Sequence, residues 1–420
     1  MTPDRHQLGA VAPRVIRLAG GAGLVALAIT IVLALVDGDA TRFFRSYLVA
    51  LLFVLTIPLG GLFFTIVQHL TRAGWSVALR RLMEGLAANL QWLWILFIPI
   101  LVLVISGRAD GLFPWLDHAH HDHALEHKAP YLNAGFWIVR AILFFGIWAF
   151  LSRFFFRNSV AQDASGDVRY THAMQRLAPV AMIMYALTQT FAAFDWAMSL
   201  SPHWFSTIFG VYFFAGTCCA FFSSLILLVF FLQRQGKLEN EVTLEHYQDV
   251  GKLLFGFGVA FWGYIGFSQF MLIWYANIPG ETTWWIARTQ GPWRTFTWLL
   301  FIGHFCIPFV VLITKHTKRH RIVIAGIAVY MLVMHALDMY WLVMPLIPDA
   351  LHHATNLQAL GNEIESDPAM VGFTPHLMDV TCLLGLLGLL VAGTAYQLRR
   401  CSLIPVRDPR LSESLAFENM

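Results

Sequence analysis

Residues 46–70 read SYLVALLFVLTIPLGGLFFTIVQHL, a run that contains no Asp, Glu, Lys or Arg. A transmembrane helix needs about 20 mostly apolar residues to cross the hydrocarbon core of a bilayer, which is about 30 Å thick. This run meets that length in one uninterrupted stretch. It therefore predicts a membrane-crossing helix, with lipid as the solvent around this part of the chain.

Nine further stretches have the same character. Across the 420 residues, 58% are hydrophobic and only 13% are charged, which is far from the usage of soluble domains. Backbone groups in hydrocarbon must pair within their own helix or in a closed barrel, and these continuous runs lack the alternation of barrel strands. We therefore predict an all-α polytopic membrane protein of one domain, 1–420, with a tail at 399–420. The ten predicted transmembrane helices cover residues 17–36, 46–70, 86–106, 133–152, 176–198, 205–232, 252–277, 294–314, 321–347 and 376–398.

Basic residues are distributed unevenly between the two sides of this predicted bundle. If both termini and every second loop share one side, that side carries 21 Lys and Arg residues and the other side carries 6. The positive-inside rule then places both termini in the cytoplasm. The net charge of +3 comes from positions that flank the membrane, so we expect the lipid bilayer and no nucleic acid as a partner.

The fifth and ninth predicted helices have a weak internal sequence similarity, and each of them ends in an aromatic and acidic cluster. The matching residues lie 143 to 146 positions apart: Tyr185 with Tyr330, Asp195 with Asp338, Trp196 with Trp341, and Pro202 with Pro348. Two four-helix bundles, formed by helices two to five and six to nine with helices one and ten at their flank, would explain this spacing. Chance similarity between aromatic-rich helices is the alternative.

Ionisable side chains inside the predicted helices are few, and each is a candidate for function because a charge in lipid costs several kcal/mol unless it is paired or hydrated. His335 and Asp338 lie three residues apart on one helical face, where an imidazole and a carboxylate could pass protons or bind a quinol hydroxyl. A purely structural link between helices is the alternative. The candidates that we single out are Arg140, Asp195, His304, His335, Asp338 and Asp379.

Arg140 keeps its proton at all accessible pH values, so we interpret it as a counter-ion of Asp195 or Asp338. The seventh predicted helix carries a polar stripe that could hold a water chain inside the bundle or only join two helices. The stripe consists of Tyr264, Ser268, Met271 and Tyr275, with Gln269 beside it.

Tryptophan is concentrated toward the outer side, which predicts a surface that docks other protein chains, with a thick one-sided interfacial belt as the alternative. The five cysteines form no C-x-x-C motif, so we predict no iron–sulfur cluster and no covalent haem in this chain. The outer loop has histidines that could collect a metal ion but lack a fixed scaffold, and we predict no metal site there. These histidines are His118, His120, His121, His123 and His127.

Two segments carry a resemblance to a known family. They are TFAAFDWAMSLSPHWFSTIFGVYFFAG at 190–216 and FSQFMLIWYANIPGETTWW at 267–285. Both resemble the ActF family, the smaller of two NrfD-like membrane subunits (polysulfide reductase NrfD family) of bacterial alternative complex III, a quinol:cytochrome c or cupredoxin oxidoreductase. The likeness extends over all ten predicted helices.

The resemblance implies a subunit of a respiratory complex in a bacterial inner membrane. Its partners would be a second NrfD-like membrane subunit, a periplasmic iron–sulfur subunit and haem c subunits. Menaquinol or another quinol would be oxidised near the outer face, and this chain, without a cofactor of its own, would supply a proton path or a quinone-facing surface. Its candidate residues are Arg140, Asp195, Tyr264, Ser268, Gln269, His304, His335, Asp338 and Asp379.

Two other functions stay open at this stage. A secondary transporter would rock two repeats around a site at the membrane midplane, but the sequence lacks a matched pair of interrupted helices in its two halves. A passive scaffold for redox partners would need only the helices.

Overall fold

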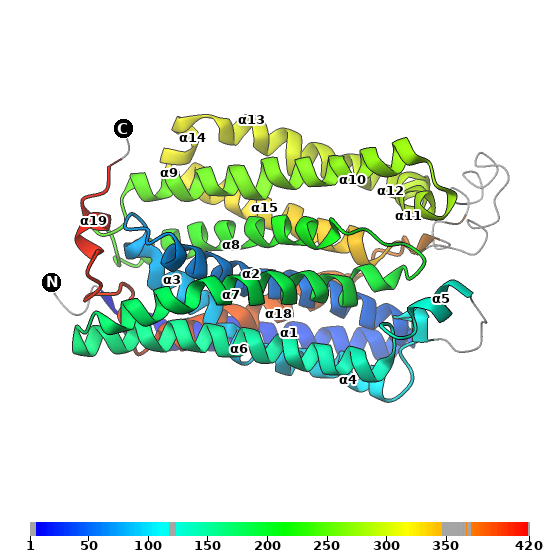
Figure 1. Ribbon diagram of the computed structural model, residues 1–420, viewed down its shortest axis with the longest axis horizontal. Coiled ribbons are helices and arrows are strands. Elements are labelled where there is room, and N and C mark those ends of the chain that lie inside the picture. Colours follow the sequence, from blue (N-terminus) through cyan, green and yellow to red (C-terminus); the bar gives the residue numbers. More distant parts are fainter. Residues whose placement is uncertain (1–5, 117–122, 347–363, 365–366, 368–370, 419–420) are drawn as a thin grey trace.

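In the computed structural model, which describes residues 6–116, 123–346, 364, 367 and 371–418, the chain is an elongated bundle of helices that run along one axis (Figure 1). Ten helical segments are long and apolar enough to cross a membrane. Helices are the only regular secondary structure in these described residues. Both chain ends lie at the same end of the bundle, as an even number of crossings requires.

Six crossings are single α-helices, and four are made of two or three helical pieces. The single helices are α1 (Val11–Asp37), α2 (Ala40–Leu70), α6 (Ala134–Ser165), α8 (Phe209–Arg234), α15 (Arg321–Val343) and α18 (Leu377–Leu398). The composite crossings are α3 (Val77–Ala87) with η2 (Ala88–Gln91) and α4 (Trp94–Ile105); α7 (Arg169–Trp196) with η4 (Met198–Leu200); α9 (Leu244–Leu253) with η5 (Leu254–Phe261) and α10 (Trp262–Ala276); and α12 (Gly291–Leu300) with η6 (Phe301–Cys306) and α13 (Ile307–Ile313). Short helices in the connections are η3 (Pro114–Leu116), α5 (His123–Lys128), α11 (Pro279–Thr289), α14 (Lys315–Arg319) and α19 (Leu411–Leu415).

All ten predicted crossings are confirmed, although several helices extend past their predicted ends. The third crossing begins at Val77, well before the predicted start, and the fourth runs on to Ser165. Ion pairs hold these extensions, because the Arg81 guanidinium contacts the carboxylates of Glu84 at 3.2 Å and Asp163 at 2.8 Å. Charged side chains that a hydropathy pattern excludes are therefore satisfied inside the protein.

Helix α2 is the centre of the fold. Its most apolar 18-residue window is 94% buried, against 11% for α1. One group of helices, α3–α4, α6 and α7, packs with α2, and a second group, α9–α10, α12–α13 and α15, packs with α8; α2 and α8 join the two groups (Figure 1). Helices α1 and α18 form a pair against α2. This is the predicted arrangement of two four-helix bundles with two flanking helices.

Two π-helical segments interrupt the second group, η5 in the seventh crossing and η6 in the eighth. Pro308 follows η6 and has no N–H group to donate to the carbonyl of His304, which favours the wider turn. π-Helical turns are rare and frequently occur at functional sites. Here they bring His304 of η6 against Trp262, the first residue after η5.

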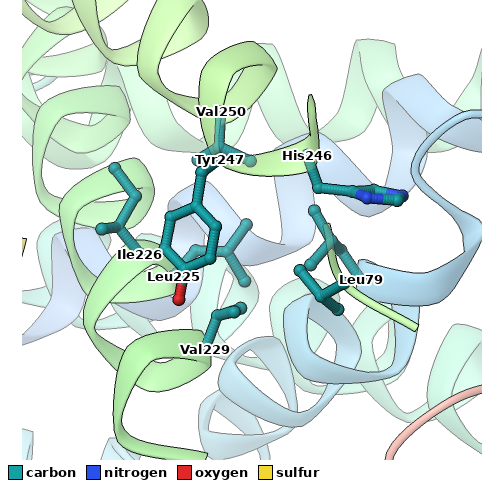
Figure 2. A pocket seen from close by; sticks show the side chains of 8 residues that line it. Leu79, Leu225, Ile226, Val229, His246, Tyr247 and Val250 are labelled. Atoms are coloured by element: carbon teal, nitrogen blue, oxygen red, sulfur yellow. The ribbon is translucent and has the colours of Figure 1, made fainter. Parts of the chain in front are cut away.

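The end of the bundle that carries both termini is closed by the C-terminal tail. Ser414 of α19 donates to the carbonyl of Trp75, and its hydroxyl lies 3.2 Å from Nε2 of His246 in α9. A void of about 10 Å³ lies beside this contact, where the Tyr247 ring projects among aliphatic side chains of α8 (Figure 2). A void of this size with apolar walls is a packing defect, which excludes it as a ligand site.

Candidate functional site

Asp338 of α15 is the most deeply placed acid in the second helix group. Its Oδ1 accepts a hydrogen bond from the Tyr212 hydroxyl at 2.5 Å, and its Oδ2 accepts one from Nε1 of Trp262 at 3.1 Å. The side chain is 0% exposed. Among the described residues no Lys, Arg or His forms an ion pair with it, so its partners are two neutral donors from α8 and α10. A carboxylate held in this way can exchange a proton through the tyrosine hydroxyl.

His335 lies one helical turn from Asp338 but does not bond to it. The Thr56 hydroxyl donates to the Phe53 carbonyl at 2.6 Å, so it accepts from Nε2 of His335 at 3.0 Å. This leaves Nδ1 unprotonated and, within the described part of the chain, without a partner. The hydroxyl of Thr56, on the central helix α2, therefore orients the His335 ring, and Asp338 does not.

Gly216 of α8 makes room for both side chains. A Cβ atom at this position would lie 2.8 Å from Cε1 of His335 and 3.8 Å from Oδ2 of Asp338. The His335 ring thus rests directly on the backbone of α8. A larger residue would push it out of place.

His304 stacks on Trp262, with ring centroids 4.0 Å apart and planes inclined by 9°. Its side chain is 0% exposed, and neither ring nitrogen makes a well-formed hydrogen bond to the described residues, although the backbone of Gly258 lies near. Trp262 therefore connects the two predicted candidates, since one face of its ring covers His304 and its N–H donates to Asp338.

A cavity of about 550 Å³ adjoins this cluster. Tyr212 and Trp262 form part of its wall, so these two side chains separate Asp338 from the cavity. At its rim, Phe267, Trp298 and Phe301 are 59%, 57% and 45% exposed, and the cavity therefore reaches the surface that the helices present to lipid. The other lining residues are Gly263, Gly266, Gln269, Phe270, Trp284, Trp285, Thr289, Arg294, Thr297, Leu300, Trp341 and Leu342.

Two polar groups in the cavity wall have no protein partner among the described residues. These are Nε2 of Gln269, a side chain that is 4% exposed, and Nε1 of Trp285. A buried donor without a partner costs about 1–3 kcal/mol. Mostly aromatic walls with a few unsatisfied donors are typical of sites that bind flat, apolar molecules through their oxygen atoms.

Arg140 and Asp195 form a separate site in the first helix group. Nε and Nη2 of Arg140 donate to the two oxygens of Asp195, at 2.6 and 3.0 Å, and the guanidinium lies 3.9 Å from the Tyr131 ring centroid. Burial, together with the Asp195 charge, raises the pKa of Tyr131, which stays neutral. The predicted counter-ion role of Arg140 is confirmed, with Asp195 as the partner. The pair is closed and, among the described residues, forms no hydrogen bond or ion pair with Asp338.

Asp379 is likewise held in a structural arrangement. It accepts from Nη2 of Arg42 at 2.6 Å and from the Ser46 hydroxyl at 2.8 Å, and it caps α18 together with His376. Every one of these contacts ties α18 to α2 at one end of the bundle. The geometry does not bring Asp379 to the cavity.

The polar stripe of the seventh crossing does not lie inside the bundle. Tyr264 and Tyr275 are 64% and 89% exposed, Met271 is exposed, Ser268 is half-buried, and of the predicted set only Gln269 is buried. The inward face of α10 is formed instead by Trp262, Ile265, Gln269 and Ile273. A bilayer accepts an apolar helix face as readily as the protein interior does, so side-chain polarity predicted the wrong face of this helix as the buried one.

The outer tryptophans are mostly core residues and leave little exposed aromatic surface for docking. Trp204 stacks on Trp284 at 4.2 Å, and only Trp274 and Trp298 of the ten expose more than half of their surface. The buried ones are Trp115, Trp137, Trp196, Trp204, Trp284, Trp293 and Trp341. Of these two exposed tryptophans, Trp298 lines the cavity.

No group of three metal-binding side chains occurs in the described ranges. His118, His120 and His121 lie outside those ranges, as does the side chain of His123. The sequence pattern did not identify four further candidate residues, which are Thr56, Tyr212, Trp262 and Arg288. Tyr212 lies in one of the two segments that carry the family resemblance, which was the available signal, whereas Trp262 has none that separates it from other aromatic residues.

Comparison of the sequence with models of protein families gave no match, and comparison with curated proteins gave none. The fold and the site define a class: a multi-pass helical membrane protein with a buried carboxylate behind a lipid-facing aromatic cavity.

Proposed function

We propose that the chain is the quinol-binding membrane subunit of a respiratory oxidoreductase of the alternative complex III type. The observation that carries this proposal is the position of Asp338 directly behind Tyr212 and Trp262, two residues of the cavity wall. A quinol is a flat apolar ring with two hydroxyl groups and a long tail. The cavity offers aromatic walls and an opening toward lipid, which suit the ring and the tail.

Oxidation of a quinol releases two protons and two electrons and leaves a quinone. The Tyr212 hydroxyl can pass its proton to Asp338 while it takes one from a quinol hydroxyl, so the first proton leaves through groups of this chain. The electrons need an acceptor, and we assign that role to iron–sulfur and haem c groups of partner subunits. Membrane location and ten crossings agree with this function, whereas the orientation with both termini in the cytoplasm is part of the proposal.

Fewer residues take part in this function than the sequence predicts. Asp338, Tyr212, Trp262 and Gln269 adjoin the cavity, with His304 and His335 next to them. Arg140, Asp195 and Asp379 stabilise the helices. The exposed Tyr264 and the half-buried Ser268 face lipid or a neighbouring subunit.

Photoaffinity labelling tests the proposal. Native membranes are treated with an azido-quinone, the chain is purified with the subunits that accompany it, and labelled peptides are identified by mass spectrometry. We expect labels on α10 and α12, at residues such as Phe267 and Trp298, and co-purification of haem c subunits. Labels confined to other helices, or a chain that purifies alone and shows no quinone labelling, would contradict the proposal and favour a transporter or a scaffold.

A further inference from the structure

Arg288 of α11 is a buried arginine that has no acidic partner among the described residues. Its side chain is 1% exposed, and its guanidinium donates only to two backbone carbonyls, those of Trp284 and Leu342, each at 3.1 Å. Nε has no partner in the same residues. Burial lowers the pKa of Arg288, but an arginine in a protein still keeps its proton. A full positive charge is therefore held here by neutral groups alone.

The residues around Arg288 belong to the cavity wall. Its guanidinium lies 3.7 Å from the Trp284 ring centroid and 5.3 Å from that of Trp341, and its second carbonyl partner is Leu342. All three residues line the cavity, and so does Thr289, the next residue in the chain. The charge thus acts on the cavity through one layer of side chains, where little water screens it.

Asp338 is the acidic counterpart of Arg288, and it lies behind the part of the cavity wall that Tyr212 and Trp262 form. It is an acid with only neutral donors, and Arg288 is a base with only neutral acceptors. The Tyr212 hydroxyl donates to Asp338, and Tyr212 lines the same cavity as Trp284 and Leu342, the two residues whose carbonyls Arg288 contacts. A buried charge without a partner is costly, so two such charges of opposite sign beside one cavity indicate a site that is completed by a ligand.

We propose that Arg288 is a specificity-determining residue of the cavity, and that its charge selects ligands whose ring hydroxyl can ionise. This inference rests on the proposed quinol site and adds a preference to it. When a ligand hydroxyl gives its proton to Tyr212, and Tyr212 gives its own to Asp338, one ligand O–H bond breaks and one O–H bond forms on the carboxylate. The negative charge then moves from Asp338 to the ligand oxygen, where Arg288 stabilises it.

Two matched compounds test this preference on the purified full-length chain. One is 2-heptyl-4-hydroxyquinoline N-oxide, a fluorescent aromatic amphiphile with an ionisable hydroxyl, and the other is its O-methyl derivative, which has the same ring and tail. Dissociation constants come from fluorescence quenching. We expect the wild-type chain to bind the hydroxyl compound at least about tenfold more tightly, because only that compound offers a negative charge to Arg288.

Substitution of Arg288 separates charge from shape. Arg288→Met should remove that preference, because it should weaken binding of the hydroxyl compound at least about tenfold and leave binding of the methylated compound unchanged. Arg288→Lys keeps the positive charge and should keep most of the preference. If Arg288→Met weakens the binding of both compounds equally, Arg288 has a structural role and the inference is overturned. If Arg288→Met does not fold, the wild-type comparison decides, since equal affinity for the two compounds also overturns the inference.

Gly266→Leu distinguishes failure of this inference from failure of the proposed function. A Cβ atom at Gly266 has only an ordinary 3.4 Å contact with the Tyr212 ring, so a leucine there extends into the cavity without strain. If this variant binds neither compound, the result supports the cavity as their binding site. A wild-type chain that binds neither compound, or a Gly266→Leu variant that binds both normally, rejects the proposed function itself.

Discussion

The Tyr212 hydroxyl of α8 donates a 2.5 Å hydrogen bond to Oδ1 of Asp338 of α15, and it does so from the wall of a cavity that reaches the lipid-facing surface. Trp262 of α10 supplies the second donor to the same carboxylate. Three helices of the second group therefore meet at one acid. The arrangement gives Asp338 contact with a ligand only through a neighbour that can carry a proton.

Removing the tyrosine hydroxyl tests this connection. Tyr212→Phe keeps the ring in the cavity wall and removes the hydroxyl that, among the described residues, can carry a proton between a ligand and Asp338, so quinol oxidation by the assembled complex should fall by about 100-fold or more. Steady-state turnover with a short-chain quinol measures the effect, and the haem c content of the purified complex reports assembly. Trp262→Phe is the matched control, because it removes the other hydrogen bond to Asp338 without breaking the path. Equal losses in the two variants would indicate that both residues only hold the carboxylate in place.

Neutralising the acid tests its role as proton acceptor. Asp338→Asn has nearly the same shape, but it cannot take a proton from Tyr212, so turnover should again fall by about 100-fold or more. The complex should still assemble, because two neutral donors and not a charged partner surround the side chain. Normal turnover with an unchanged ratio of protons released to electrons transferred would show that the proton leaves elsewhere.

Gly216 is predicted to be essential for the position of His335. Gly216→Ala places a Cβ atom 2.8 Å from the His335 ring, and relief of this overlap should lower the free energy of unfolding by about 1–3 kcal/mol. Gly326→Ala, on α15 itself, is the control, because a Cβ there meets nothing within 4 Å. Thermal unfolding of both variants in detergent measures the difference. Identical melting temperatures would mean that the ring moves aside at no cost.

How much of this site the sequence revealed depends on the chemistry of each residue. Arg140 was predictable as a counter-ion because charged residues are scarce in these helices, but the sequence left Asp195 and Asp338 open as its partner. The ten crossings were predictable for the same reason, since hydropathy dominates over any local signal. Asp338 was found as a buried acid, but its partners were not.

Aromatic residues explain what was missed. With 35 Phe, 15 Trp and 11 Tyr in the chain, nothing in the sequence distinguishes Trp262 from the rest, and Tyr212 differs only because it lies in a segment that carries the family resemblance. Their roles arise from packing across helices that are far apart in sequence, and in part from the π-helical turns that set Trp262 against His304. The sequence also did not predict which face of each helix is buried, because lipid accepts the same apolar side chains as the protein core does.

The ion pair of Arg140 and Asp195 should contribute to stability and not to turnover. Arg140→Gln leaves the buried carboxylate uncompensated, and we expect a loss of about 3–5 kcal/mol in the free energy of unfolding. The double variant Arg140→Gln, Asp195→Asn should recover most of that loss, because no lone charge is left in the helix group. Thermal unfolding of the single and double variants checks this coupling. If the double variant is as unstable as the single one, the pair contributes through its shape and its contacts with Tyr131, and not through its charges.

The orientation of the chain is open to direct measurement. Ser412 of α19 lies at the end of the bundle that carries both termini, and Glu126 of α5 lies at the opposite end; both are exposed (Figure 1). With both termini in the cytoplasm, a membrane-impermeant maleimide should label Glu126→Cys in intact spheroplasts and Ser412→Cys only in inverted vesicles. The native Cys401 near the tail should give little background, since burial raises the pKa of its thiol, and a higher pKa leaves less reactive thiolate at neutral pH. The reverse labelling pattern would place the cavity, which adjoins α11 at the α5 end, on the cytoplasmic side, and would exclude release of quinol protons to the outer face.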